Sequence, residues 1–269
     1  MKSNAFLPFI LATFVFSWIC WGIAIATGQP SQSFPTVLFY ILGGSGPSIV
    51  ALFFVFRLFD PAARKDFWAR FSFKRIRPLW WVLSLVGMPA LLVAGTALDV
   101  IFGGQPPALP NLWALLGDPV SIPIFLIMSL IGGPLSEELG WRGIVLESFQ
   151  KKWSPLPATL TLGAIWWFWH LPLFFIRGTT HYDWGLFSPM FWLFLVNVFC
   201  LTLIMTLAYN HNQRSITAAV LIHFAYNLAL ALLVPFSTQG FALITLLLAA
   251  AALAALALFK WQPAAQEPR

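Results

Sequence analysis

Long apolar segments separated by short polar turns dominate this chain of 269 residues. A helix needs roughly 20 apolar residues to cross the hydrocarbon core of a bilayer. Eight segments reach this length, with approximate bounds of 5–28, 36–59, 79–103, 120–147, 155–177, 188–209, 215–236 and 239–260. Charged residues make up only 9% of the chain, whereas a soluble domain has about 25%. The sequence therefore predicts an all-α, polytopic integral membrane protein with about eight transmembrane helices.

No linker or repeat divides these segments. We expect a single transmembrane helical domain over residues 1–261 and a short cytoplasmic tail over residues 262–269. Residues 60–77 mix aromatic and basic side chains, which is typical of an interfacial amphipathic helix. Residues 104–119 are rich in proline and predict an external loop.

Lysine and arginine residues lie almost entirely on one side of the predicted membrane. They gather near both chain ends and in the connections 60–78 and 148–154, while the connections 29–35 and 104–119 carry none; Arg177 is the exception. By the positive-inside rule, both termini and the basic connections are cytoplasmic. The net charge of +6 then reflects basic loops beside anionic lipid, so the bilayer and not a nucleic acid is the expected partner.

Three ionisable side chains stand close together in the fourth segment, within the stretch EELGWR over residues 137–142. Carboxylates in a bilayer-embedded helix are costly, and a site lining a pocket or pathway is their default interpretation. Glu138 and Arg142 share a helix face at i, i+4 and can form an ion pair. Glu137 lies about 100° around the helix, which leaves it free as a general base. A wholly structural knot between helices is the alternative.

Polar residues also interrupt the fifth and seventh segments. His170 lies in an aromatic stretch, and Trp166 precedes it by one turn and could wall a pocket. His223 and Asn227 share one face at i, i+4 spacing. Such groups can donate hydrogen bonds to an oxyanion, and histidine can ligate a metal. Interhelical hydrogen bonding without any catalytic role is the alternative.

Other features are assigned to structure. His181 and His211 fall in predicted loops, and Asp99 lies near the external end of a span, so we expect solvated or interfacial side chains there. Residues 43–47 (GGSGP) and 132–134 (GGP) interrupt the second and fourth segments. Small residues allow close helix approach, and proline kinks a helix. A kink beside the carboxylates would also admit the water that hydrolysis needs.

The polar residues resemble the motifs of the CPBP family of intramembrane proteases, also called the Abi or type II CAAX prenyl endopeptidase family. The match consists of three motifs in order: EExxxR at Glu137, Glu138 and Arg142, aromatic-xxx-His at Trp166 and His170, and HxxxN at His223 and Asn227. It covers about residues 120–230, a family-like catalytic core. Trp166 stands where phenylalanine is more usual in the family.

The resemblance implies intramembrane hydrolysis of a peptide bond in a membrane-associated substrate, which some family members carry out on prenylated CAAX proteins. It also implies a role for each matched residue. Glu137 would be the general base, helped by His170. His223 and Asn227 would stabilise the oxyanion. Glu138, Arg142 and Trp166 would orient the site.

Two chemistries would use the same residues. Zn²⁺ held by Glu137, His170 and His223 would lower the pKa of a bound water to about 7, whereas in a metal-free mechanism a desolvated glutamate acts as the base by itself. Two other classes of protein also fit the composition: a non-catalytic membrane adaptor or bacteriocin-immunity-type protein, and a transporter with a proton relay. Transporters often carry inverted repeats, and the sequence shows no convincing repeat.

Overall fold

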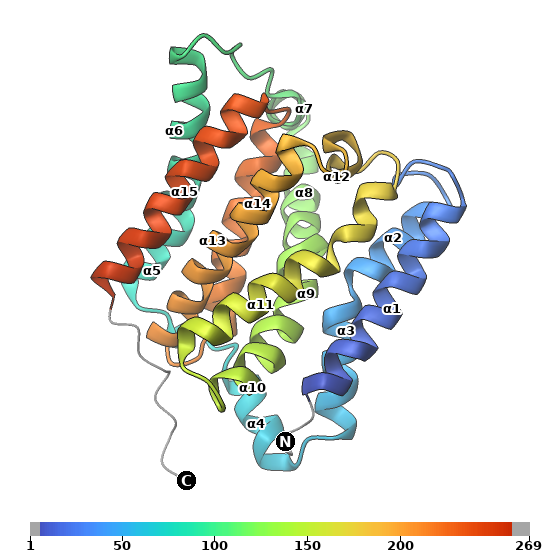
Figure 1. Ribbon diagram of the computed structural model, residues 1–269, viewed down its shortest axis with the longest axis vertical. Helices are drawn as coiled ribbons and strands as arrows, with labels where there is room; N and C mark the ends of the chain where they lie inside the picture. Colours follow the sequence, from blue (N-terminus) through green and yellow to red (C-terminus); the bar gives the residue numbers. More distant parts are fainter. Residues whose placement is uncertain (1–5, 260–269) are drawn as a thin grey trace.

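The computed structural model describes residues 6–259, and these residues form helices without a β-strand (Figure 1). The α-helices are α1 (Phe6–Ala26), α2 (Thr36–Gly44), α3 (Gly46–Arg57), α4 (Pro61–Ala69), α5 (Pro78–Val82), α6 (Met88–Ile101), α7 (Pro110–Gly117), α8 (Ile122–Leu130), α9 (Ser136–Gly140), α10 (Glu147–Gln150), α11 (Pro155–Trp169), α12 (Thr180–Trp184), α13 (Pro189–His211), α14 (Ile216–Leu233) and α15 (Thr238–Leu258). Short π segments (Leu83–Gly87, Ile131–Leu135, Trp141–Leu146) and 3-10 segments (Phe73–Arg75, Pro119–Ser121, Leu171–Phe175) connect some of them. The expected tail over 262–269 lies outside the described residues.

The prediction of about eight spans is confirmed. Seven helical stretches are long and apolar enough to cross a membrane, and α2 and α3 add an eighth as a pair bent by 53°. Two of the seven contain more than one α-helix: Pro78–Ile101 contains α5 and α6, and Pro119–Gln150 contains α8, α9 and α10. The chain is therefore a multi-pass integral membrane protein, and its lipid-spanning backbone is helical because a bilayer offers no water to unpaired peptide groups.

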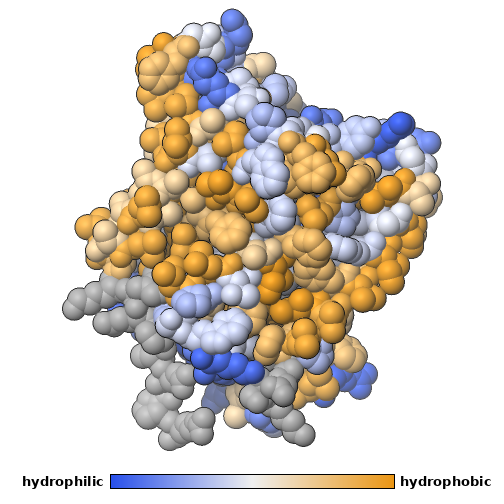
Figure 2. Space-filling view, in the orientation of Figure 1, coloured by the Kyte–Doolittle hydropathy of each residue, from blue (hydrophilic) through white to orange (hydrophobic). Residues whose placement is uncertain are grey.

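Helix α1 shows the inverted pattern that a membrane imposes. Its outer stripe contains Leu11, which is 56% exposed, and Val15 and Ile19, which are each 59% exposed. Its inner stripe contains Thr13 and Ser17, which are fully buried. A surface helix of a soluble protein turns its apolar stripe inward. Figure 2 shows hydrophobic residues over much of the flank and hydrophilic residues gathered near the two ends of the bundle.

Glycine lets three helices pack backbone against backbone at the centre. A Cβ atom on Gly140 of α9 would lie 2.7 Å from the carbonyl oxygen of Pro47 in α3. A Cβ on Gly46 would lie 2.1 Å from the hydroxyl of Ser17 in α1. No real side chain tolerates such distances without movement of its neighbours. These contacts hold α9 inside the bundle, where all five of its residues are buried.

The fourth span breaks just before α9, as the GGP stretch predicts. Gly132 and Gly133 leave helical geometry, and Pro134 has no N–H to donate. The hydroxyl of Ser136 donates to the carbonyl of Gly133 at 3.0 Å, and the hydroxyl of Ser48, from α3, donates to the carbonyl of Leu135 at 2.9 Å. Carbonyls that the break could leave unpaired are therefore hydrogen-bonded inside the bundle.

An ion network fixes the basic end of the bundle. Arg214, in the turn between α13 and α14, donates to both oxygens of Asp66 in α4 at 3.0 and 2.8 Å. The same guanidinium donates to Glu147 of α10 at 3.0 and 2.8 Å. Asp60 caps α4 by accepting from the N–H of Ala63 at 2.8 Å, and this backbone hydrogen bond lowers the pKa of Asp60.

The secondary structure of two connections differs from the prediction. The interfacial helix predicted over 60–77 is shorter, because α4 ends at Ala69 and only residues 73–75 form a further 3-10 turn. The loop predicted over 104–119 contains the helix α7. Proline at the first position of α7 is compatible with a helix start, and proline content alone therefore did not distinguish a loop from a short helix.

Asp99 and His211 both pack against neighbouring helices near the ends of their spans. Asp99 is 6% exposed and accepts a hydrogen bond from the hydroxyl of Ser237 at 2.8 Å. His211 ends α13, and its ring lies 6.1 Å from Trp80 and 5.1 Å from Phe259, centroid to centroid. Both positions lie near span ends, where packing between neighbouring spans decides exposure and sequence position does not.

Candidate active site

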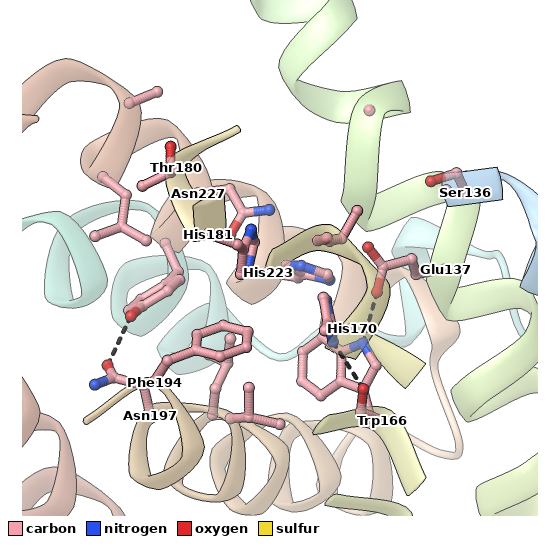
Figure 3. A pocket seen from close by; sticks show the side chains of 18 of the residues that line it. Ser136, Glu137, Trp166, His170, Thr180, His181, Phe194, Asn197, His223 and Asn227 are labelled. Atoms are coloured by element: carbon pink, nitrogen blue, oxygen red, sulfur yellow. Dashed lines mark hydrogen bonds between the residues drawn. The ribbon is translucent and has the colours of Figure 1, made fainter. Parts of the chain in front are cut away.

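Five of the seven side chains singled out in the sequence line one cavity of about 510 Å³ (Figure 3). They come from three different spans: Glu137 from α9, Trp166 from α11, His170 from the C-terminal end of α11, and His223 and Asn227 from α14. The remaining two, Glu138 and Arg142, lie behind this wall and are both 0% exposed. The tertiary structure therefore brings together residues up to 90 positions apart in the sequence, Glu137 and Asn227.

Glu137 is oriented by one neighbour and open on its other side. The indole Nε1 of Trp166 donates to Oε2 of Glu137 at 2.6 Å. The second oxygen, Oε1, faces the cavity near Gly133. A hydrogen bond to one carboxylate oxygen fixes the plane of the group and leaves the other oxygen free to accept a proton. This arrangement suits a general base.

Glu138 forms an ion pair with Arg142, as the i, i+4 spacing predicts. Nη1 of Arg142 lies 3.0 Å from Oε1 and 2.9 Å from Oε2 of Glu138. His223 donates from Nδ1 to Oε1 of Glu138 at 2.9 Å. The guanidinium of Arg142 also lies over the ring of Trp166, 4.8 Å from its centroid. One buried ion pair thus contacts α11 and α14 as well as its own span.

The hydrogen bonds of the two histidines set their tautomers. Nδ1 of His170 lies 2.7 Å from the backbone carbonyl of Trp166. A carbonyl only accepts, so Nδ1 of His170 carries the proton. Nδ1 of His223 likewise carries the proton that it donates to the Glu138 carboxylate. In their neutral forms both rings therefore present an unprotonated Nε2, which can accept a hydrogen bond.

A small space beside Gly133 lies between the polar groups. A Cβ atom on Gly133 would lie 3.0 Å from Nδ2 of Asn227, 3.6 Å from Oε1 of Glu137 and 3.9 Å from Nε2 of His223. Glycine at this position therefore leaves open a space that a base, an amide donor and an imidazole nitrogen all face. The space is suited to a reacting group that needs a base on one side and a hydrogen-bond donor on the other.

Two comparisons with known proteins agree on the family. The pattern of the family described as "Type II CAAX prenyl endopeptidase Rce1-like" matches residues 119–229, a range that contains all seven site residues. The chain is also 28% identical, over 232 residues, to a protein of Methanococcus maripaludis named "CAAX prenyl protease 2", with 84% of each chain covered. In both comparisons this chain is similar to type II CAAX prenyl endopeptidases of the Rce1-like family. The resemblance seen in the three motifs is thereby confirmed.

Glu137, His170 and His223 are the residues that the sequence analysis above gives as ligands if a zinc ion is present. Carboxylate oxygen and imidazole nitrogen are donor types that zinc takes. Within residues 6–259, however, no group of three His, Cys, Asp or Glu side chains is arranged so that it could hold a metal ion.

His181 is a cavity residue that the sequence analysis assigned to a loop. It lies on α12 and lines the same cavity, with its ring centroid 5.8 Å from that of His170 and the two planes 24° apart. Burial lowers the pKa of His181 to about 4. A solvated side chain is therefore the wrong description. Spacing could not reveal this, because α12 contributes only five residues to the sequence pattern.

A polar pair in the same cavity was also missed. The hydroxyl of Tyr226, on α14, donates to Oδ1 of Asn197 on α13 at 2.7 Å. Nδ2 of Asn197 donates to the carbonyl of Leu193 at 3.0 Å and to the hydroxyl of Thr245 on α15. The available signal was the amide itself, since Asn197 is a polar residue within an apolar span. The amide oxygen and nitrogen of Asn197 both form hydrogen bonds within the protein. The pair of Asn197 and Tyr226 therefore stabilises the packing of α13, α14 and α15.

Replacement of Arg142 tests its buried ion pair with Glu138. Arg142→Met leaves Glu138 as a buried carboxylate without its cation, and we expect the free energy of unfolding to fall by about 3–5 kcal/mol. The double variant Glu138→Gln, Arg142→Met removes both charges and should be less destabilised than Arg142→Met. Unfolding in detergent gives these values, with Arg177→Met on an exposed loop as the charge-matched control. Equal stability of Arg142→Met and wild type would disprove the pairing.

Proposed function

We propose that this protein is an intramembrane endopeptidase that hydrolyses a CAAX-type, prenylated protein substrate with a water molecule activated by Glu137. The position of Glu137 carries the proposal. Trp166 fixes one carboxylate oxygen, and the other faces the space beside Gly133 that Asn227 also faces. The match to the Rce1-like family pattern and the similarity to a protein named CAAX prenyl protease 2 support the substrate class.

The chemistry is a general-base hydrolysis. Oε1 of Glu137 removes a proton from water while the water oxygen bonds to the carbonyl carbon of the scissile peptide bond. Glu137 then passes that proton to the amide nitrogen as the C–N bond breaks, which yields a carboxylic acid and an amine. His170 accepts a hydrogen bond from the same water at Nε2 and orients it. General-base catalysis of this kind contributes about 10²–10⁴ to a rate.

The oxyanion of the tetrahedral intermediate needs donors on the opposite side. Asn227 supplies its Nδ2–H group, which faces the same space as Oε1 of Glu137. The single N–H of a neutral His223 ring is at Nδ1, where it forms a hydrogen bond to Glu138. His223 can therefore donate from Nε2 only as an imidazolium. Glu138 stabilises that imidazolium, and Arg142 balances the charge of Glu138. The buried pair therefore acts on the reaction through His223.

The cavity is suited to a few residues of extended chain that arrive from the lipid. Its volume of about 510 Å³ lies within the common range for ligand pockets, about 300–1,000 Å³, and excludes a folded domain. Three of its lining residues are lipid-facing apolar side chains: Ile41 is 47% exposed, Met128 is 52% exposed and Ile131 is 46% exposed. These side chains form an apolar rim of the cavity next to α2 and α8. A prenyl group beside this rim can remain in the membrane.

The orientation follows the distribution of charge. We propose that both termini and the connections 60–78 and 148–154 are cytoplasmic, because cytoplasmic loops carry the excess of Lys and Arg. The cavity then lies in the half of the bundle away from these connections, since α11 leads from residues 151–154 to His170 and on to α12.

Replacement of Glu137 tests both the base and the absence of a metal requirement. Glu137→Gln should lower the rate of cleavage of a fluorescent, farnesylated CAAX peptide by about 10²–10⁴, while Asp118→Asn, at an exposed carboxylate, should retain it. Wild-type activity should survive a chelator, and metal analysis should find no stoichiometric zinc. Full activity of Glu137→Gln would contradict the general base. Loss in chelator with recovery in Zn²⁺ would contradict only the metal-free mechanism.

A methyl group beside the base tests the space itself. Gly133→Ala places a Cβ 3.0 Å from Nδ2 of Asn227 and 3.6 Å from Oε1 of Glu137. The added methyl group should displace the reacting groups and lower kcat/KM about 100-fold, with little change in melting temperature. Gly132→Ala is the matched control, because a Cβ there meets nothing within 4 Å. Similar activity of the two variants would place the reaction elsewhere.

Thiol labelling tests the orientation. Cys20 and Cys200 are replaced by alanine, and one cysteine is introduced at Thr180 on α12 or at Lys151 on the basic turn; both sites are exposed. In intact cells, a membrane-impermeant maleimide should label the cysteine at 180 and spare the one at 151. Lysed cells, in which both should react, provide the accessibility control. The reverse labelling pattern would show that the basic connections are external.

A further inference from the structure

His181 is half-buried in the wall of the candidate active site, and one of its ring nitrogens has no hydrogen-bond partner in the part of the chain that the structure describes. Its Nε2 is buried and has no hydrogen-bond partner among residues 6–259. Figure 3 shows the side chain in the cavity together with Asn227 and His223. The mechanism above gives His181 no task, although its ring stacks on His170.

Packing alone does not explain a histidine at this position. The ring lies among Phe174, Trp184 and Phe194, at centroid distances of 5.2, 5.3 and 4.8 Å. A phenylalanine would fill the same aromatic cluster without an unpaired polar atom, which costs about 1–3 kcal/mol when buried. The cost is recovered when a molecule that enters the cavity supplies the missing partner.

The backbone around His181 is held in place before any substrate arrives. Thr179 caps α12 by accepting from the N–H of Tyr182 at 3.1 Å, and its hydroxyl donates to the carbonyls of Leu173 and Ile176, each at 2.9 Å. Gly178 accepts from Ser31 of the α1–α2 connection at 3.0 Å. The imidazole is therefore pre-positioned, which lowers the entropy that binding must offset.

The position of His181 defines how far from the reaction it can act. Its ring centroid lies 5.8 Å from that of His170, and an extended chain advances about 3.3 Å per residue. A group bound by His181 thus lies within about two residues of the scissile bond. Among residues 6–259, the lining of the cavity contains no Lys or Arg, and Glu137 is its only carboxylate. A neutral group, not a carboxylate, suits this environment.

We propose that His181 hydrogen-bonds a backbone peptide group of the substrate within two residues of the scissile bond, and so determines where along the chain the enzyme cuts. The proposal rests on the endopeptidase function proposed above. A neutral imidazole can donate to a peptide carbonyl or accept from a peptide N–H, so this contact selects an extended backbone and not a particular side chain.

Three proteins and a set of peptides test the proposal. His181→Phe keeps the aromatic packing and removes the hydrogen bond, and His181→Gln keeps an amide that can form one. Cleavage of a fluorescent, farnesylated CAAX peptide should show KM raised about tenfold in His181→Phe, the effect of one hydrogen bond to a buried group, with kcat changed less than about twofold. His181→Gln should recover part of this KM. Melting temperatures confirm that both variants fold.

Backbone-modified peptides identify the contact. Depsipeptide or N-methyl substitutions are placed singly within two residues of the scissile bond. With His181 intact, the substitution at one position only should weaken binding of the peptide. His181→Phe should be insensitive to the modification at that position. Binding is measured on the Glu137→Gln background, so it does not depend on cleavage.

An unchanged KM in His181→Phe would overturn the proposal. A fall in kcat alone would also overturn it, because His181 would then be a positioning residue for His170. Failure of the wild type to cleave the peptide would instead refute the proposed function.

Discussion

The buried ion pair of Glu138 and Arg142 holds the three spans of the candidate site in register. An isolated charge buried in the protein would cost several kcal/mol. Loss of any partner of the Glu138 carboxylate is therefore strongly unfavourable. Those partners are Arg142 on its own span and His223 on α14, while Arg142 lies over Trp166 of α11. Trp166 in turn orients Glu137. One electrostatic requirement therefore fixes the relative positions of groups that the proposed reaction uses.

The site also depends on interrupted helices. Irregular backbone survives at membrane depth only where it is buried in protein or lines a cavity, and the break at Gly132 and Gly133 does both. Ser48 and Ser136 pair carbonyls beside the break. Gly133 leaves open the space that Glu137 and Asn227 face, and Gly140 lets α9 approach α3. Glycine thus has two separate uses in one span, an open space at one position and close packing at the other.

The sequence predicts much of this arrangement because two kinds of regularity survive folding. Apolar length gives the spans, since a bilayer has a fixed thickness. Helical spacing gives the pairing of Glu138 with Arg142, because residues at i and i+4 share a face whatever surrounds them. The position of His181 in the cavity was not predicted, and α7 was missed, because each lies in a short connection, where no periodicity of sufficient length exists.

The sequence by itself determined that the chain crosses a membrane about eight times, which helix faces carry its polar residues, and which family it resembles. These depend on composition and on spacing within single helices. Only the tertiary structure decided that Glu137, Trp166, His170, His223 and Asn227 share one cavity. It also decided that His181 joins them. Distances between spans depend on how helices pack around glycine contacts and a buried charge, and no single-helix pattern contains that information.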